Sequence, residues 1–477
     1  MNAPRILIWI AFAVLGYAGL MFLTSLVALG VGEFRQFRIF SVIALLLFVV
    51  TAITILAVQN NQERETPKDA MLFLVAFWIL VPVVIAIPYV ASGVAHDWRH
   101  AYFEAVSAIT TTGASTFVPE SLPKALLFWR ACVQWSGGVL VATFAVVILA
   151  ALNLRGTGVH RSMFFTIQDG ALLSRIFSVG RLVALVYFLI ALICFAFLVI
   201  GKTSVFDALC LSLSAVSTGG LTPQSGVLAN YVSKFGGIVL AITCMLGAAN
   251  VSILWDVIHR RNRAAFKNLF TNVEHRGLFV IFSLLFLIGF AFVGYEHIHT
   301  IFVEAAFMAS TAGFDYHVIG LDIVPPGILI AIALVGGSAL STAGGLKLIR
   351  LLLLFRHLKT DLNRMTHPSR VMPVLFQGQQ IKDKAFLSIW MYFFAYTVLF
   401  GLGIVALGAA EMDITVAISA CASALANFGP LLQATSPGIG YDEMNIVQLS
   451  ILSIIMLFGR IEILAAFAAI SPSLWRK

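Results

Sequence analysis

The sequence predicts an all-α polytopic membrane protein, with an N-terminal helical hairpin followed by four helix–pore-helix–helix units around a pseudo-fourfold pore. The first observation is composition, because 60% of the 477 residues are hydrophobic, only 11% are charged and the mean hydropathy is +0.98. A water-soluble domain carries about 25% charged residues, so the main solvent of this chain is the bilayer. The second observation is a short polar break ending in glycine, which recurs at four places in the apolar sequence.

The apolar runs set the order of the elements. About 20 apolar residues span the hydrocarbon core of a membrane, and about ten runs reach that length. The first, residues 6–30, is too long for a signal-peptide core, and it pairs with residues 39–58 as the hairpin. The later runs come in pairs, each enclosing a half-length segment that ends at a glycine break: 71–91 with 126–152, 182–200 with 227–258, 278–293 with 323–355, and 386–410 with 446–470. We therefore divide the chain into the hairpin and four pore units: residues 1–69, 70–155, 156–262, 263–359 and 360–477.

The four breaks are the predicted functional core. Glycine reaches positive φ angles freely, so successive carbonyl oxygens can turn to one side. Four such segments around one axis would form stacked rings of carbonyls that replace the water around a cation. A single break is explained equally well as a helix end with a glycine cap, but four in register favour a shared ion filter. The predicted filter residues are Thr111, Thr112, Gly113, Ser217, Thr218, Gly219, Thr311, Ala312, Gly313, Asn427, Phe428 and Gly429.

The basic residues indicate the orientation of the chain. The net charge is +8, but the bases lie in short loops between apolar runs, which does not indicate a nucleic-acid-binding surface. Cytoplasmic loops are enriched in Lys and Arg, so we expect the links between units and both termini to be cytoplasmic. Arg35 and Arg38 in the hairpin fit this orientation less well. The cysteines lie in apolar stretches without metal or disulfide spacing: Cys132, Cys194, Cys210, Cys244 and Cys421.

With these segments in order, the chain resembles the Trk/Ktr/HKT family of potassium transporters, most closely the bacterial Trk-type potassium-uptake membrane subunit. The resemblance covers nearly the whole chain, and the leading hairpin is similar to the longer, Trk-type architecture. The stretches that carry it are Phe103-Glu104-Ala105, Thr110-Thr111-Thr112-Gly113-Ala114, Gln134-Trp135-Ser136-Gly137-Gly138, Ser214-Ala215-Val216-Ser217-Thr218-Gly219-Gly220, Ser310-Thr311-Ala312-Gly313-Phe314 and Asn427-Phe428-Gly429-Pro430.

The resemblance implies a potassium-uptake protein of the bacterial cytoplasmic (inner) membrane. It implies a multi-pass chain in membrane lipid, with four pseudo-equivalent units around one pore, paired as a homodimer and regulated by a cytoplasmic nucleotide-binding ring. Glycine in all four filters resembles the potassium-permeable members, whereas the sodium-selective plant members carry serine in the first filter. The implied ion is K⁺, bound at the filter residues, with no transition metal, organic cofactor, nucleic-acid partner or enzymatic activity.

A glycine-rich segment, residues 336–345, is the predicted gate. It contains Gly336, Gly337, Gly344 and Gly345 among other small residues, which lower helix propensity and let the backbone leave helical geometry. The resemblance implies that the matching segment is an intramembrane loop that blocks the pore below the filter. Close helix packing through small residues is the alternative.

Arg460 is the other predicted gate residue. It lies near the middle of the run 446–470, where a charge costs about 2.5–3.5 kcal/mol on insertion scales and faces a cavity or a partner. The resemblance implies an arginine that points into the pore beside the glycine-rich segment, and a salt bridge to Glu462 is the alternative. Arg130, near Lys124 at the start of its helix, is expected to snorkel.

The acidic residues near the breaks leave two roles open. They can concentrate cations at the mouth, or they can cap and brace the half-length segments. They are Glu104, Asp207, Glu304 and Asp315. Capping or packing is favoured for Glu104 and Glu304. The histidines nearby show no metal-ligand spacing: His100, His299 and His317.

A sodium- or proton-coupled secondary transporter is the alternative function. Such proteins place ionisable residues at the membrane midplane, and apart from Arg460 and Glu462 the apolar runs contain few. A membrane-embedded enzyme is not indicated, because the chain contains no HExxH or GxSxG motif and no paired intramembrane aspartates.

Overall fold

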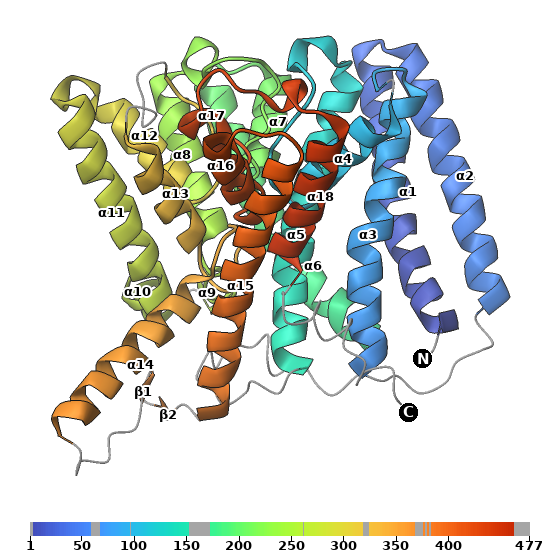
Figure 1. Ribbon diagram of the computed structural model, residues 1–477. Coiled ribbons are helices and arrows are strands. Elements are labelled where there is room, and N and C mark those ends of the chain that lie inside the picture. Colours follow the sequence, from blue (N-terminus) through green and yellow to red (C-terminus); the bar gives the residue numbers. More distant parts are fainter. Residues whose placement is uncertain are drawn as a thin grey trace.

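The structure, a computed structural model, describes residues 3–58, 67–95, 97–151, 172–260, 262–317, 324–367, 375–376, 379–380 and 383–461. The regular structure in these ranges is helical, apart from two-residue strands β1 (Leu375–Phe376) and β2 (Gln379–Gln380), which pair antiparallel. The long helices run roughly side by side from one end of the molecule to the other (Figure 1). The predicted all-α class is confirmed.

Seven helices in the described ranges are long and apolar enough to cross a membrane. Their outer faces expose large apolar side chains, such as Leu45, Phe279 and Phe394, which are 63%, 62% and 70% exposed. Apolar surface of this extent is unfavourable in water, and it suits a protein surrounded by lipid tails. The helices are α1 (Ala3–Val31), α2 (Phe34–Val58), α3 (Pro67–Ala91), α5 (Lys124–Ala151), α6 (Leu172–Ile200), α11 (Val273–Val293) and α15 (Asp383–Ala409).

A helix of 12 residues occupies each half-length segment: α4 (Trp98–Ile109), α7 (Val205–Val216), α12 (Ile298–Ala309) and α16 (Ile414–Leu425). Such a helix is about 18 Å long, too short for a hydrocarbon core of about 30 Å. All four half-helices lie in the same half of the bundle (Figure 1). Three begin at a side-chain cap, because Asp97, Ser204 and Asp413 accept backbone N–H groups of the first turn.

The second helix of unit two is broken. Helices α8 (Lys234–Ala248) and α9 (Val251–Arg260) meet at an angle of 103°. The C-cap of α8, Ala249, has extended backbone, and Asn250 then caps α9 by accepting the N–H of Ser252 at 3.1 Å. The prediction of one spanning helix over residues 227–258 is therefore wrong.

The second helices of units three and four also stop early. The glycine-rich segment is non-helical and separates α13 (Pro326–Val335) from α14 (Leu348–Thr366). A continuous helix packed through small residues is therefore the wrong alternative for this segment. Helix α18 (Ile446–Arg460) ends at Arg460 itself, so Arg460 is not in the middle of a described helix. Residues beyond 461, including Glu462, lie outside the described residues.

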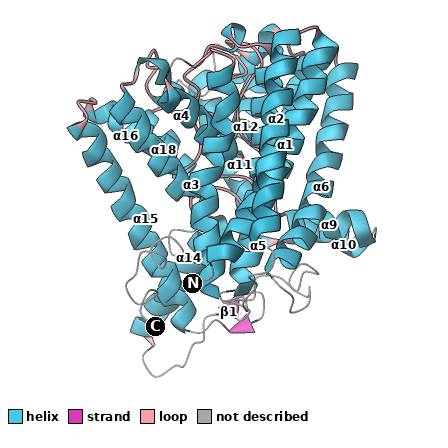
Figure 2. Cartoon of the chain, turned by 90° about the vertical axis from the view of Figure 1, so that its right-hand side faces the viewer, coloured by secondary structure: helices cyan, strands magenta, loops and turns pink. Residues whose placement is uncertain are grey.

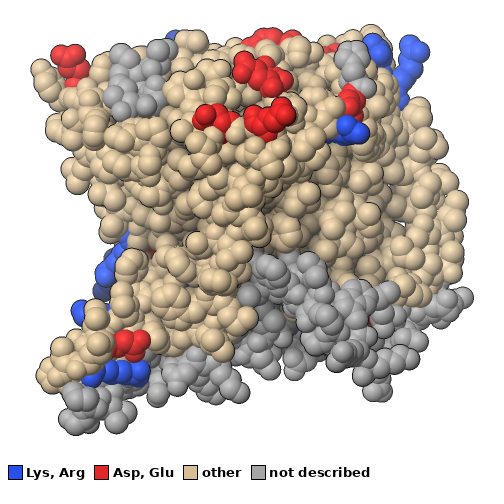
Figure 3. Space-filling view, in the orientation of Figure 1, with Lys and Arg blue, Asp and Glu red and all other residues tan. Residues whose placement is uncertain are grey.

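The remaining described elements are short: η1 (Pro119–Ser121), η4 (Leu228–Asn230), α10 (Arg263–Thr271), η5 (Tyr295–His297), α17 (Leu431–Thr435) and η7 (Tyr441–Glu443). Helices α9 and α10 project from the side of the bundle (Figure 2). Most of the Asp and Glu side chains on the face drawn in Figure 3 gather in the half of the molecule that contains the half-helices. On this face, a cation that approaches the half with the half-helices therefore meets more carboxylates than one that approaches the other half.

Candidate ion pathway

Each half-helix ends in the same turn. In α4, the Thr111 N–H bonds to the Ala108 carbonyl at 3.0 Å and the Thr112 N–H bonds to the Ser107 carbonyl at 2.9 Å, which is the Schellman pattern. The same pair of bonds closes α7, α12 and α16. The residue that reverses the chain is left-handed in every copy, although none of the four is glycine: Thr111 (φ 52°), Thr218 (51°), Thr311 (60°) and Asn427 (48°). This backbone costs about 1–2 kcal/mol per residue, so other contacts must hold the turns.

The glycines that follow these turns differ from the predicted register in one copy. Counting two residues on from the left-handed residue leads to Gly113, Gly220, Gly313 and Gly429. The structure therefore matches Gly220, rather than Gly219, to Gly113, and Gly219 takes the place of Thr112. The predicted second filter, residues 217–219, is shifted by one residue. Two adjacent glycines look alike in sequence, and only the backbone separates them.

The four turns contact one another in a closed ring. A Cβ atom added to any of the four matched glycines would overlap an atom of the next turn along the chain, and the fourth glycine meets the first turn. The neighbours met are Gly219 for Gly113, Ala312 for Gly220, Phe428 for Gly313 and Ala114 for Gly429. The Gly429 N–H also donates to the Thr112 carbonyl at 2.6 Å, which joins the fourth turn to the first. Close approach to backbone atoms therefore favours glycine at Gly113, Gly220 and Gly429, whereas Gly313 meets the Phe428 ring and is also left-handed.

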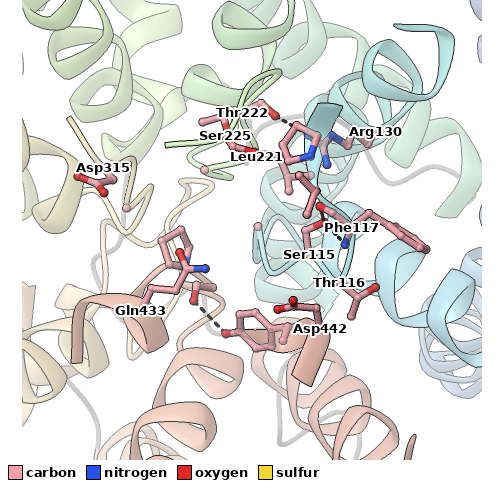
Figure 4. Close-up of a pocket in the computed structure, with 18 of the residues that line it drawn as sticks. Ser115, Thr116, Phe117, Arg130, Leu221, Thr222, Ser225, Asp315, Gln433 and Asp442 are labelled. Carbon is pink, nitrogen blue, oxygen red and sulfur yellow. Dashed lines mark hydrogen bonds between the residues drawn. The ribbon is translucent and has the colours of Figure 1, made fainter. Parts of the chain in front are cut away.

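A cavity of about 280 Å³ lies directly on this ring (Figure 4). Its lining includes all four matched glycines, which come from four separate units, and Gly220 rather than Gly219 is among them. The carboxylates of Asp315 and Asp442 also line it, on different segments (Figure 4). A cation in the cavity would therefore be near two carboxylates as well as the backbone of the ring.

Glu104 and Arg130 form a buried pair that holds the segments after the first and second turns. Both side chains are buried, and their charged groups lie 3.7 Å apart. Glu104 also accepts the Ser115 hydroxyl at 2.9 Å and the Thr116 N–H at 3.3 Å, while Arg130 donates to the Thr222 carbonyl beyond the second turn. The packing role favoured for Glu104 is confirmed. The expectation that Arg130 snorkels is wrong, because its charge is paired inside the protein.

Two further acidic residues are hydrogen-bonded within the protein, and neither lines the cavity. Glu304 accepts the His317 N–H at 3.2 Å, after the third turn, which agrees with the packing role. Asp207 accepts the Ser204 hydroxyl at 2.7 Å and the Gln224 side-chain amide at 2.8 Å, after the second turn. Of the four acidic candidates, Asp315 is the one that lines the cavity.

The glycine-rich segment lies against the other side of the turns. The Thr218 hydroxyl donates to the Thr342 hydroxyl at 3.0 Å, and the Gly344 N–H donates to the Thr311 hydroxyl at 2.9 Å. A Cβ on Gly344 would overlap the carbonyl oxygen of Ala426, just before the fourth turn. The segment thus contacts the second, third and fourth turns, and its residues are buried.

The predicted gate glycines have distinct roles in this loop. Gly336 (φ 74°) and Gly345 (φ 68°) are left-handed, one at each end of the segment. A Cβ on either would also approach the backbone of the other within 3.0 Å. Gly337 and Gly344 are packed closely against Ala343 and Ala426. Gly336 therefore lies where the chain leaves α13, and Gly345 lies shortly before the chain enters α14.

Arg460 joins the first turn to the glycine-rich segment. Its guanidinium donates to the Thr110 carbonyl at 2.5 Å and to the Thr111 hydroxyl, and through Nη1 to the Thr342 carbonyl at 2.7 Å. Arg460 thus lies beside the glycine-rich segment, as the resemblance implied, and bonds a carbonyl of that segment. The contacts with the end of α4 were not predicted, because they depend on the helix ending beside that turn.

Lys347 is a neighbour of the segment that the sequence reading missed. Its Nζ donates to the Ala343 carbonyl at 2.6 Å and to the Ser341 carbonyl at 3.2 Å. A lysine directly after a run of small residues was the available signal. Two cationic side chains therefore hold carbonyls of one short stretch.

The described residues form neither a cluster that could hold a metal ion nor a disulfide. No group of three or more His, Cys, Asp or Glu side chains is arranged there to hold a metal ion. His299 contacts the Lys234 carbonyl at 2.9 Å through Nε2, and His317 packs near His297. The five cysteines, all within the described ranges, are buried and form no disulfide.

Comparison with known proteins gives one consistent result. A family model described as TrkH, cation transport protein, matches residues 35–477. The Trk system potassium uptake protein TrkH of Salmonella typhimurium is 30% identical over 98% of both chains, and that of Escherichia coli K12 is 29% identical over 98% of both. The crystal structure of the potassium transporter TrkH from Vibrio parahaemolyticus matches with a TM-score of 0.88 at 26% identity, covering 100% of both chains. These relatives are transport proteins rather than enzymes, as the sequence reading expected, and the chain belongs to the TrkH family of cation transport proteins.

Proposed function

We propose that this chain takes up K⁺ across the bacterial cytoplasmic membrane through the ring of four turns. Backbone carbonyls and hydroxyls gathered at one level can replace the water around a bare cation. The names of the relatives, potassium uptake proteins, favour K⁺ as the ion. The proposed filter keeps the twelve predicted residues, 111–113, 217–219, 311–313 and 427–429, and adds Gly220 as the glycine of the second turn.

The closed ring is the observation that carries this proposal. Each turn ends a half-helix, so four helix C-termini meet at one ring. A helix C-terminus carries a partial negative charge of about half an elementary charge. A cation on the axis is therefore stabilised by helix dipoles as well as by oxygen atoms, and the missing Cβ atoms let the turns approach closely enough to share it.

The glycine-rich segment and Arg460 form the proposed gate. The segment is bonded to Thr218 and Thr311, and Arg460 is bonded to Thr111, so both stand directly against the ring. A fixed charge about 4 Å from a cation costs roughly 4 kcal/mol at an effective dielectric of 20. A barrier of that size slows permeation by about a thousandfold. Movement of the segment and Arg460 together would remove it.

Rubidium flux into reconstituted vesicles tests the proposal. Arg460→Ala removes the charge and should raise flux per folded protein, whereas Arg460→Lys, which keeps the charge without the guanidinium fork, should raise it less. Arg276→Ala is the matched control, because Arg276 is an exposed arginine on α11. Flux that stays flat or falls in folded Arg460→Ala contradicts the gating role.

The same vesicles separate uptake through a pore from coupled transport. A pore predicts rubidium flux that follows the membrane potential, with single-channel current. A requirement for a sodium or proton gradient would support the secondary-transporter alternative instead. The homodimer, the cytoplasmic nucleotide-binding ring, the cytoplasmic termini and the unit boundaries remain part of this proposal.

A further inference from the structure

The α8–α9 break and the glycine-rich segment between α13 and α14 both contact one buried carboxylate, that of Glu274. This residue lies in the first turn of α11 and its side chain is fully buried. Its Oε2 accepts the Ala339 N–H of the glycine-rich segment at 2.9 Å and lies 3.4 Å from the side-chain nitrogen of Asn250 at the α8–α9 break. One side chain of a third helix therefore contacts both interruptions.

Backbone hydrogen bonds join the same two interruptions around Glu274. The Ser338 N–H donates to the Ala248 carbonyl at 3.2 Å, and the Val251 N–H donates to the Leu340 carbonyl at 2.9 Å. These bonds lie on either side of Ala339 in the sequence. The stretch 338–340 is thus fitted onto the α8–α9 break, with the Glu274 carboxylate at its centre.

Glu274 is itself well anchored. Asn272 caps α11 by accepting the Glu274 N–H at 2.9 Å, so the backbone of this turn is fixed. A carboxylate also suits the first turn of a helix, where the dipole favours negative charge. The Ala339 N–H, by contrast, belongs to a buried non-helical segment and needs an acceptor from outside its own backbone.

We infer that Glu274 is a positioning residue that holds the glycine-rich segment closed and couples it to the α8–α9 break. The inference rests on the proposed gating function of that segment. Arg460 bonds the Thr342 carbonyl, further along the same stretch. Glu274 and Arg460 are therefore two separate anchors of one loop, the first through an N–H group and the second through a carbonyl.

Single-channel recording of the full chain in planar bilayers, with rubidium as the permeant ion, tests this inference. Glu274→Ala removes the acceptor and should raise the open probability about tenfold, the effect of losing a hydrogen bond to a carboxylate. The single-channel conductance and the rubidium-to-sodium permeability ratio should not change, because the hydrogen bonds of Glu274 described above go to the glycine-rich segment and the α8–α9 break. Glu274→Gln keeps a side-chain oxygen that can accept, so it should raise the open probability less.

Control variants distinguish an effect of Glu274 on gating from an effect on stability alone, and from a failure of the proposed gating function. Glu296→Ala changes an exposed glutamate beyond the other end of α11 and should have no effect. If Glu274→Ala does not fold, Glu274→Gln and Glu274→Asp decide, and a lowered melting temperature with unchanged open probability in both overturns the inference. If Arg460→Ala raises the open probability and the folded Glu274 variants do not, Glu274 is not an anchor. If neither raises it, the gating function fails and the inference falls with it.

Discussion

The first three turns of the ring and the fourth turn begin alike and then diverge. In the first three, the matched glycine is left-handed, with φ of 80°, 78° and 65° at Gly113, Gly220 and Gly313. Gly429 lies outside that region, and Pro430 (φ −62°, ψ −15°) starts the short helix α17 directly after it. The fourth copy therefore turns into a helix where the others continue as non-helical chain.

This divergence changes what the carbonyl groups can do. The Gly429 carbonyl accepts the Tyr441 hydroxyl at 2.9 Å and the Ser423 hydroxyl at 3.0 Å, and the Phe428 carbonyl accepts the Ser423 hydroxyl at 2.9 Å. Oxygens that bond to the protein are less able to replace water around an ion. A repeated sequence pattern thus predicts a shared turn, and the residues after it decide whether the turn coordinates. We expect the carbonyls of the first three matched glycines to carry more of the ion coordination than that of Gly429, while the Thr112 carbonyl, which accepts the Gly429 N–H, contributes less.

The largest expected effect is at the second turn. Gly220→Ala would place a Cβ against the Ala312 carbonyl, which belongs to the third turn. We expect rubidium uptake to fall at least about tenfold, the factor that about 1.4 kcal/mol of lost ion stabilisation produces. Uptake per folded protein is the measurement.

Gly226→Ala is a closely matched control for this change. Gly226 has nearly the same φ, 75° against 78°, and also lines the cavity, but the nearest atom to a Cβ there is 3.8 Å away, an ordinary contact distance. Both variants carry the strain of a left-handed alanine, about 1–2 kcal/mol, and only one disturbs the ring. Equal losses in the two variants would mean that strain, and not the ring, explains the effect.

A smaller effect is expected at the fourth turn. Tyr441→Phe removes the hydroxyl that bonds the Gly429 carbonyl and pairs with Ser423 at 2.6 Å. Ser423 still holds that carbonyl, so the rubidium-to-sodium permeability ratio should change less than about threefold, while stability falls by about 1 kcal/mol. A loss of rubidium uptake as large as that of Gly220→Ala would contradict the unequal roles of the turns.

The smallest effect concerns the loops outside the first two turns. Glu120 accepts the Ser225 N–H at 2.7 Å and the Ser225 hydroxyl, and these hydrogen bonds hold the pKa of its carboxyl below the ordinary 4.5. A lowered pKa contributes stability above pH 4.5 that is lost as the pH falls through the folded pKa. The melting temperature of Glu120→Gln should therefore drop less between pH 6 and about pH 3 than that of the wild type.

Glu443→Gln is the control for the acid titration, because Glu443 is an exposed carboxylate beyond the fourth turn. It should follow the wild type across the same pH range. Parallel curves for Glu120→Gln and the wild type would show that the Glu120–Ser225 contact does not stabilise the fold.

The features that the sequence predicted are those that depend on local residues. Half-helix length, the four breaks and the loop at residues 336–345 follow from glycine, small residues and the spacing of apolar runs. The Gly219/Gly220 register was missed, because adjacent glycines are chemically identical and the turn is defined by Thr218. The register became visible through the left-handed backbone of Thr218 and Gly220 and through the place of Gly220 in the cavity lining.

Features that depend on distant partners could not be predicted from local pattern. The α8–α9 break contains ordinary small residues up to Ala249, and its stability comes from contacts with the glycine-rich segment and Glu274. A lone glutamate at the start of an apolar run resembles a loop residue. Arg130 likewise resembles a snorkelling base until its pairing with Glu104 is known.

Ions are proposed to pass through the ring and to be coordinated mainly by its first three turns. Anomalous diffraction from crystals grown with rubidium shows directly where the ion binds. Rubidium density should lie on the axis of the ring, closer to the carbonyls of Gly113, Gly220 and Gly313 than to that of Gly429. Density outside the ring, in protein that still takes up rubidium, would contradict it.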